Sequence, residues 1–300
     1  MKKLNLSKSK IIIVVVLVIA IVIAVVFGLT QNKSSYASKI SDGSQTFISD
    51  KKVSVTKQEF YEYLLDNYGA SQILDEVLNT IADKEITDQK EIDKLLQERI
   101  KTYAQYSDGS IEEYAKSLGY SSAKEYEDTS LLPQVKQELL RKKYINENFD
   151  SLMSEFQVCS MKKIVVSKES SALSIIKKST SEEEFDKQMK TYDDKGEDLG
   201  IITKNTTLDD NLLDKLGDLS KINKDGVYKD AIKLSDDSYA VVFMYNTDHN
   251  KNKDEYQETL ASDGDVQTKV ESYYLKKYEF TVNEKKLKDA IKEISSDYID

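Results

Sequence analysis

One uninterrupted apolar stretch dominates the hydrophobic pattern of this 300-residue chain. The nineteen residues from Ile11 to Leu29 carry no charged or polar side chain. A helix of that length is about 28 Å long, close to the hydrocarbon thickness of a bilayer. Residues 1–10 contain four lysines and no acid, and such cationic flanks stay on the cytoplasmic side of a membrane. The pattern predicts a cytoplasmic tail at 1–10, a single transmembrane anchor at 11–29 in the cell membrane, and an extracellular location for everything that follows.

A cleaved signal peptide is the alternative interpretation of this stretch. Signal peptides usually have a shorter apolar region, followed by a small-x-small cleavage site. Ser35-Tyr36-Ala37 is a poor match to such a site, and no cysteine follows the stretch closely enough to carry a lipid. A retained anchor is therefore the prediction. Residues 30–46 are polar and contain serine and glycine, which is typical of a flexible linker.

From residue 47 to 155 the apolar positions recur at intervals of three and four, which predicts an all-helical segment after a short extended start at 47–55. The strongest such stripe is Ile73, Leu74, Val77, Leu78 and Ile81. Helix starts are marked by pairs of a capping residue and a glutamate three positions later, and these are Thr56 with Glu59, Asp88 with Glu91, and Ser110 with Glu113. Pro133 suits the first turn of another helix.

The pattern changes over 156–248, where short β-rich runs alternate with amphipathic helices in the order β-α-α-β-α-β-β. Asp236-Asp237 separates the last two runs and indicates a hairpin. Residues 249–300 are helical again, and their last amphipathic helix, from Glu284, needs a partner surface. The sequence predicts an α+β protein in which 249–300 complete the helical domain of 47–155, with 156–248 inserted between them.

Charge and rare residues narrow the chemistry. The chain has 53 acidic against 43 basic residues, which argues against nucleic-acid binding. One cysteine and one histidine exclude an intramolecular disulfide, a histidine-based triad and a histidine-rich metal site, so no metal or other cofactor is expected. Cys159 is predicted to be a small buried hydrophobic residue, and His249 to lie in a solvated loop.

Three segments together resemble the PrsA-type extracellular foldases of Gram-positive bacteria, which are relatives of SurA and of the parvulin-type prolyl isomerases. The first segment is VSVTKQEFYEYLLDNYGASQILDEVLNTIADKEITDQKEI, similar to the helical start of that family. The second is the β-α-α-β-α-β-β module, in which GEDLG at Gly196 to Gly200 resembles the parvulin GG-x-LG turn. The third is YEFTVNEKKLKDAIKEI, similar to the closing helix of the family. The resemblance implies a SurA/PrsA-like helical chaperone domain with an inserted parvulin-like module.

The resemblance also locates the isomerase site, and there the chain departs from the family. The two histidine positions of parvulins correspond to Lys163 and Ala240, and only Asp193 or Asp194 could stand for the family's acid or thiol. The Met and Phe of the proline pocket correspond to Leu208 and Leu212. The peptide-binding residues implied by the resemblance are Leu199, Leu208, Leu212, Tyr239 and Val241.

The function expected from the resemblance is a membrane-anchored chaperone that binds unfolded secreted polypeptides and assists their folding after translocation. Without the two histidines, its module is expected to be a weak or inactive prolyl isomerase, because isomerisation must lower a barrier of about 18–20 kcal/mol. An active parvulin-type isomerase is the first alternative, and a non-enzymatic structural protein of the cell surface is the second. A homodimer remains open.

Overall fold

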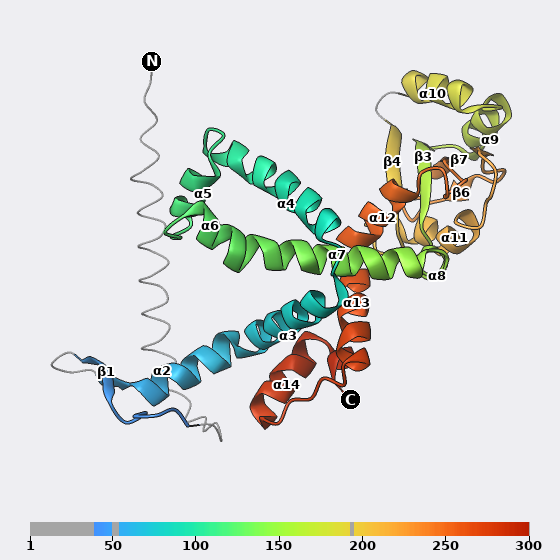
Figure 1. Cartoon of the computed structure of the whole chain (residues 1–300). Helices are drawn as coiled ribbons and strands as arrows, with labels where there is room; N and C mark the ends of the chain where they lie inside the picture. Colours follow the sequence, from blue (N-terminus) through green and yellow to red (C-terminus); the bar gives the residue numbers. More distant parts are fainter. Residues whose placement is uncertain (1–38, 50–53, 193–194, 300) are drawn as a thin grey trace, which may run out of the picture. The chain divides into compact units, whose positions relative to one another are not determined.

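The structure is a computed structural model, and it describes residues 39–49, 54–192 and 195–299. These residues form two compact units (Figure 1). Unit 1 combines the described residues up to 81 with those from 271 onward, and unit 2 comprises residues 82–270. The boundary falls within two helices, α3 (Ala70–Glu85) and α13 (Gly264–Lys277).

The boundaries of these two units differ from those of the predicted domains at 47–155, 156–248 and 249–300. The predicted division into domains stays a prediction. The predicted tail, the anchor at 11–29 and the first part of the linker lie outside the described residues. Within the part of the chain that the structure describes, no helix combines the length and the apolar character needed to cross a membrane.

Unit 1 begins with a short antiparallel hairpin of β1 (Thr46–Ser49) and β2 (Ser54–Thr56), where a single extended segment was predicted. Helix α2 (Lys57–Leu64) follows, and Thr56 and Glu59 form the predicted capping box. The helix continues through a π-helical turn, η1 (Leu65–Gly69), into α3. The remaining elements of unit 1 are the end of α13, α14 (Lys285–Ile294) and the turn η4 (Ser296–Tyr298).

The last helix of unit 1 packs on its first helical segment. Leu287 and Ile291 are the buried residues of α14, and a Cβ atom added to Gly69 in η1 would lie 2.8 Å from the Leu287 Cδ2 atom. A larger residue at position 69 would force the Leu287 side chain to shift, so glycine favours this close approach. The closing helix thus packs on the N-terminal helical segment, at its π-helical turn η1.

Unit 2 contains a helical part and a sheet. The helical elements are α4 (Gln89–Ala104), the turn η2 (Gln105–Ser107), α5 (Ile111–Ser117), α6 (Ala123–Tyr126), the π-helical turn η3 (Glu127–Leu131), α7 (Leu132–Glu147), α8 (Phe149–Glu155) and α12 (Lys253–Ser262). The helix starts at Asp88 and Ser110 are confirmed, since each side chain accepts backbone N–H groups of the following turn. Pro133 lies in the first turn of α7, as predicted.

A bidentate ion pair joins α4 to α7. The Arg99 Nε and Nη2 atoms donate to the Glu138 carboxylate at 2.7 to 3.0 Å, and Lys142 approaches the same carboxylate at 2.9 Å. Desolvation alone would raise the pKa of Glu138, but the hydrogen bonds from Arg99 and Lys142 outweigh it and lower this pKa. Because the folded-state pKa is lowered, the stabilisation is present above the unfolded-state pKa and is lost as the pH falls through the folded-state value.

Glu138→Gln is expected to lower the free energy of unfolding at pH 7 by about 1–2 kcal/mol, because it breaks a half-buried charge-assisted pair. The difference from the unaltered chain should shrink as the pH falls below about 4, where the native carboxylate also becomes protonated. Urea unfolding between pH 3 and 7 measures both effects. Glu98→Gln, at an exposed position of α4 next to Arg99, is the control, and an E138Q penalty that does not change with pH would contradict the prediction.

The sheet of unit 2 has the order β4-β3-β7-β5, with β6 also paired to β7, and all its pairings are antiparallel. Its strands are β3 (Cys159–Val166), β4 (Gly196–Ile202), β5 (Gly226–Val227), β6 (Ile232–Lys233) and β7 (Tyr239–Tyr245). Its helices are α9 (Glu169–Lys178), α10 (Glu182–Thr191) and α11 (Asp210–Leu219). The observed order is β-α-α-β-α-β-β-β, so the predicted β-α-α-β-α-β-β lacks only the two-residue strand β5, and the predicted turn at Asp236-Asp237 is present. The structure is thus α+β.

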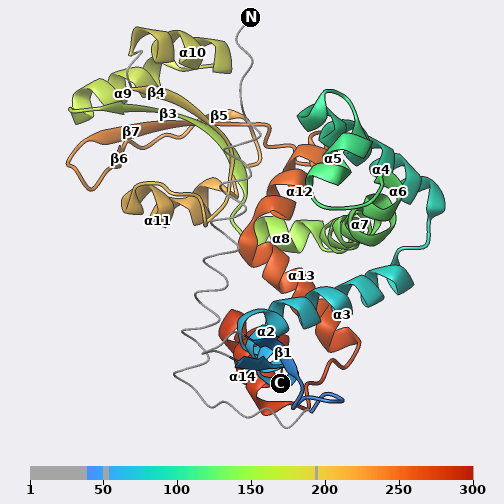
Figure 2. The same cartoon turned by 90° about the vertical axis from the view of Figure 1, so that its left-hand side faces the viewer.

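Each face of the sheet has its own hydrophobic core (Figure 2). Helix α11 covers one face through Leu212, Leu216 and Leu219. Helices α9 and α10 cover the other face, where Ile175 and Phe185 are buried. Because successive residues of a strand point to opposite faces, neighbouring positions of β3 and β7 belong to different cores.

Candidate functional site

The two positions that correspond to the parvulin histidines lie on the same face of the sheet. Lys163 in β3 is opposite Val242 in β7, and Ala240 in β7 is opposite Val165 in β3, so Lys163 and Ala240 are diagonal neighbours on the α11 face. Ala240 has no exposed surface. The Lys163 Nζ atom lies 2.9 Å from the Glu197 carboxylate of β4.

A cavity of about 610 Å³ opens at this end of the sheet. The residues that line it are Lys163, Val165, Val166, Ser167, Lys195, Gly196, Glu197, Asp236 and Ser238. None of them is a histidine or a cysteine, so the lining has an ion pair and hydroxyl groups but no group that exchanges protons near neutral pH. Asp193 and Asp194 lie outside the described residues.

The predicted peptide-binding residues divide between the two faces. Leu212 is part of the core under α11, and Leu199 and Leu208 pack against that core partly buried. Tyr239 and Val241 belong to the opposite core, under α9 and α10, and Val241 is fully buried there. The structure therefore brings the three leucines together with Ala240 and separates them from Tyr239 and Val241. The physical reason is the two-residue period of β7.

Sequence reasoning missed a charged network on the α10 face. Lys162 is buried in β3, and its Nζ atom lies 2.8 Å from Glu182 and 2.7 Å from Asp186, both in α10. Desolvation would lower the pKa of Lys162, but its hydrogen bonds to Asp186 and Glu182 give a net increase. Two successive lysines in a strand covered on both faces were the available signal, because one of them must point into each layer.

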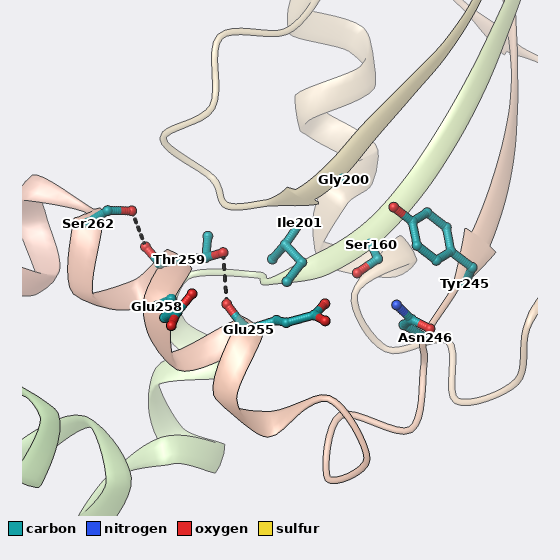
Figure 3. Close-up of a pocket in the computed structure, with 9 residues that line it drawn as sticks. All are labelled: Ser160, Gly200, Ile201, Tyr245, Asn246, Glu255, Glu258, Thr259 and Ser262. Atoms are coloured by element: carbon teal, nitrogen blue, oxygen red, sulfur yellow. Dashed lines mark hydrogen bonds between the residues drawn. The ribbon is translucent and has the colours of Figure 1, made fainter. Parts of the chain in front are cut away.

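A groove runs between the edge strand β4 and helix α12, and we call it the sheet-side groove (Figure 3). Its volume is about 470 Å³. Its lining residues are Ser160, Gly200, Ile201, Tyr245, Asn246, Glu255, Glu258, Thr259 and Ser262. The two glutamates are exposed residues on α12, and no basic side chain lines this groove among the described residues. The groove therefore presents negative charge.

A second groove, the helix-side groove, has a volume of about 790 Å³. It is lined from α12, from α7 and from the segment that joins α3 to α4. Its lining residues are Glu85, Ile86, Thr87, Asp88, Glu91, Lys94, Leu139, Lys142, Lys143, Asn146, Asp254, Gln257 and Glu258. Five of these are acidic and three are lysines, so an acidic excess is present here too. Glu258 lines both grooves, which places α12 between them.

Tyr256 holds α12 against the sheet. Its side chain is fully buried, and its hydroxyl group lies 2.7 Å from the Ser160 Oγ atom of β3 and donates to the Asn246 carbonyl oxygen at 3.0 Å. On the side of α7, the Lys253 Nζ and Gln257 Nε2 atoms both donate to the Asn146 Oδ1 atom. The two grooves thus share a helix that is fixed from both sides.

The lone histidine lies in the loop after β7, as predicted, but it is less exposed than expected. His249 is partly buried between the exposed Asp248 and Asn250, and its ring centroid is 4.8 Å from that of Tyr256. Burial lowers the pKa of His249, although the nearby Asp248 and Asp150 carboxylates act in the opposite direction. No group of three or more histidine, cysteine or acidic side chains suited to a metal occurs among the described residues.

Cys159 is 2% exposed at the start of β3, as predicted, and burial raises the pKa of its thiol to about 12. We expect this thiol to react with a disulfide reagent at pH 8 at least about 100-fold more slowly in the folded chain than in guanidinium, since the thiolate is the reactive form. Because the chain has one cysteine, the unfolded control must give one equivalent of released thiolate. Equal rates in the folded and unfolded chain would refute a buried thiol.

The sequence comparisons find no match: no protein-family model and no curated protein matches this chain. Solved structures of PrsA proteins are similar to it. Peptidylprolyl isomerase PrsA from Bacillus cereus is 16% identical with a TM-score of 0.44, over 84% of this chain and 99% of that one. PrsA from Bacillus subtilis is 23% identical with a TM-score of 0.40, over 83% of this chain and 98% of that one. The foldase protein PrsA from Streptococcus pneumoniae is 18% identical with a TM-score of 0.36, over 85% and 100% of the two chains.

Proposed function

We propose that this chain is an extracytoplasmic foldase of the PrsA type, anchored in the cell membrane by residues 11–29. In this proposal it binds unfolded polypeptides in the two grooves along α12 and does not catalyse prolyl isomerisation. The observation that carries the proposal is the pair of open grooves that share Glu258, with an acidic excess in each.

The grooves suit an extended chain better than a small molecule. Gly200 and Ile201 of the sheet-side groove belong to β4, which is an edge strand with no strand partner on its outer side among the described residues. An extended polypeptide can bind such an edge through backbone hydrogen bonds, which do not depend on its sequence. A foldase with many clients needs recognition of that kind.

The charges of the grooves favour basic clients. The Glu255 and Glu258 carboxylates take part in no ion pair with another described residue, so both are free to meet a lysine or arginine of a bound segment. Exposed charges of this kind give modest affinity and accelerate encounter. Weak and reversible binding is what a holding chaperone requires, because a client must leave in order to fold.

Isomerase activity is disfavoured by the site at the other end of the sheet. The position of one parvulin histidine holds Lys163 in an ion pair with Glu197, and the position of the other holds a fully buried methyl group. Neither can polarise or orient a prolyl amide as an imidazole pair would. In this proposal the parvulin-like module serves only as a scaffold for the sheet-side groove.

Glu255→Lys combined with Glu258→Lys is expected to weaken binding of a positively charged, permanently unfolded client roughly 10-fold, since two exposed charge contacts become repulsions. Fluorescence anisotropy with the whole chain in lipid nanodiscs measures the affinity, and suppression of client aggregation measures the function. The matched control is Glu98→Lys with Glu183→Lys, which makes the same change of net charge at exposed positions outside both grooves. Equal weakening by both pairs would refute binding in the grooves.

The isomerase alternative has a separate readout. The nanodisc-bound chain should leave the slow, proline-limited phase of a client's refolding unchanged, while a parvulin added in its place shortens that phase. Acceleration by this chain would establish the alternative. Failure to bind or protect any unfolded client would instead favour the structural surface protein.

A further inference from the structure

Exposed apolar side chains are concentrated in unit 1. Among the described residues, nine large apolar side chains are exposed, and six of them belong to unit 1, although this unit has far fewer described residues than unit 2. The six are Phe47, Ile48, Leu64, Tyr68, Tyr273 and Ile294. A concentration of this kind marks an interaction surface more often than chance exposure does.

Four of these side chains, together with Phe60, form a row that we call the N-terminal apolar row. Its members are Phe47, Ile48, Phe60, Leu64 and Tyr68. Phe47 and Ile48 are 53% and 55% exposed in β1, all of whose residues are exposed. The Phe47 ring stacks on Phe60 of α2, with 5.0 Å between ring centroids. Phe60, Leu64 and Tyr68 follow at intervals of four, which places them along one side of the helical segment.

The core of unit 1 makes no use of this row. Helix α2 has no buried residue, and the neighbouring strand β1 is exposed along its whole length. The grooves of the proposed function lie in unit 2, so client binding there does not account for the row either. A separate occupant is needed for it.

The position of the row in the sequence identifies that occupant. The apolar stretch ends at Leu29, and the described chain begins at Lys39. The nine residues 30–38 span at most about 30 Å even when fully extended. If Ile11 to Leu29 cross the membrane, Lys39 is held within that distance of the bilayer surface, and β1 follows only seven residues later.

The chemistry of the row suits a lipid interface. Aromatic rings and a β-branched aliphatic side chain partition into the headgroup and upper acyl region of a bilayer, and tyrosine is enriched there. Lys57 begins α2 next to the row, with its Nζ atom donating to Gln45, and can remain at headgroup level. Because the anchor makes the contact intramolecular, a weak interfacial affinity is sufficient.

We propose that the N-terminal apolar row lies in the headgroup region of the outer leaflet, with phospholipid as its ligand. This proposal rests on the membrane anchoring in the proposed function. Docking of the row would fix unit 1 against the membrane surface instead of leaving it on a free linker. Unit 1 would then be held close to the bilayer.

The chain has no tryptophan, so a single introduced tryptophan reports its own surroundings. Phe47→Trp in the whole chain, reconstituted in vesicles of phosphatidylcholine and phosphatidylglycerol, is the test variant. Tyr106→Trp is the matched control, because Tyr106 is 74% exposed in unit 2. We expect brominated lipid to quench the fluorescence of Trp at position 47 about twofold or more and to leave that at position 106 unchanged.

Flotation of the same samples separates the two proposals. A chain that does not float with vesicles lacks the anchor, and the docking proposal fails with it. A chain that floats, but whose tryptophan at position 47 is not quenched, retains the anchor and overturns the docking. Equal quenching at both positions overturns a specific role for the row. A signal that changes with protein concentration but not with brominated lipid assigns the row to a second copy of the chain.

A second experiment tests whether the two parts of the N-terminal apolar row, in β1 and in α2, act together. Leu64→Trp supplies a reporter on α2, and Phe47→Ser with Ile48→Ser removes the exposed apolar residues of β1. Quenching of the reporter should fall at least about twofold when the two serines are present. Unchanged quenching would show that α2 meets the lipid without the hairpin and would overturn the row as the docking element.

Discussion

Tyr256→Ala is expected to lower the free energy of unfolding by about 3–5 kcal/mol, the range for deletion of a fully buried aromatic side chain. Tyr256 has no exposed surface, and its hydroxyl group joins Ser160 of β3 to Asn246 at the end of β7. Losing the ring also leaves a cavity between α12 and the sheet, so client binding in both grooves should weaken along with stability. Urea unfolding and the anisotropy assay measure the two losses.

Tyr256→Phe separates the hydroxyl group from the ring. It keeps the packing and leaves the Ser160 hydroxyl and the Asn246 carbonyl without this partner, which should cost about 1–3 kcal/mol. Tyr106→Phe is the control, because Tyr106 is 74% exposed in the same unit. If Tyr256→Ala proved no more destabilising than Tyr256→Phe, the packing of α12 on the sheet would not depend on this ring.

Ala240→His is expected to destabilise the chain by about 2–4 kcal/mol without creating isomerase activity. Ala240 is fully buried, between Ile232 of β6 and Val165 of β3 in the register of the sheet, so an imidazole must displace core side chains and bury polar nitrogens. Lys163→His, at the partly exposed partner position, should cost less than about 1 kcal/mol.

The double variant with both histidines tests whether the scaffold still accepts a parvulin site. We expect it to be as destabilised as Ala240→His alone and to leave proline-limited refolding unaccelerated, because the core has closed over position 240. Measurable isomerase activity in the double variant would show that the residues at these two positions alone account for the proposed inactivity of the module.

Local signals in the sequence were sufficient to predict most of the elements. The capping pairs at Thr56 and Asp88, Pro133 in a first turn, and the turn at Asp236-Asp237 all act over a few residues, and each is present in the structure. The order of the helices and of four of the five strands in the module follows from the same kind of signal, because hydrophobic period and turn residues are properties of short segments. The two-residue strand β5 was missed, since so short a run has no period of its own.

The site was less predictable because it depends on which face each residue occupies. Tyr239 and Val241 were predicted to share a site with Leu212. Successive side chains of β7 point to opposite faces of the sheet, however, and these two lie in the other core. The ion pairs of Lys162 with Glu182 and Asp186 bring together residues that are 20 and 24 positions apart in the sequence. Likewise, His249 is next to Asp248 in the sequence, but its ring contacts Tyr256, seven residues later. Such pairings are set by tertiary packing, which no short pattern encodes.

The contact between Gly69 and Leu287 has a consequence for how the chain acquires its structure. A polypeptide made from its N-terminus onward has α2 and η1 long before it has α14, and about 190 residues of unit 2 come between the two parts of unit 1. Unit 2 is continuous in sequence, so it can fold as soon as it is complete, whereas the early helices must wait for the last thirty residues. Contacts that close so long a loop form late. A released chain that ends before Leu287 should therefore contain a protease-resistant unit 2 and a unit 1 that is still open to cleavage.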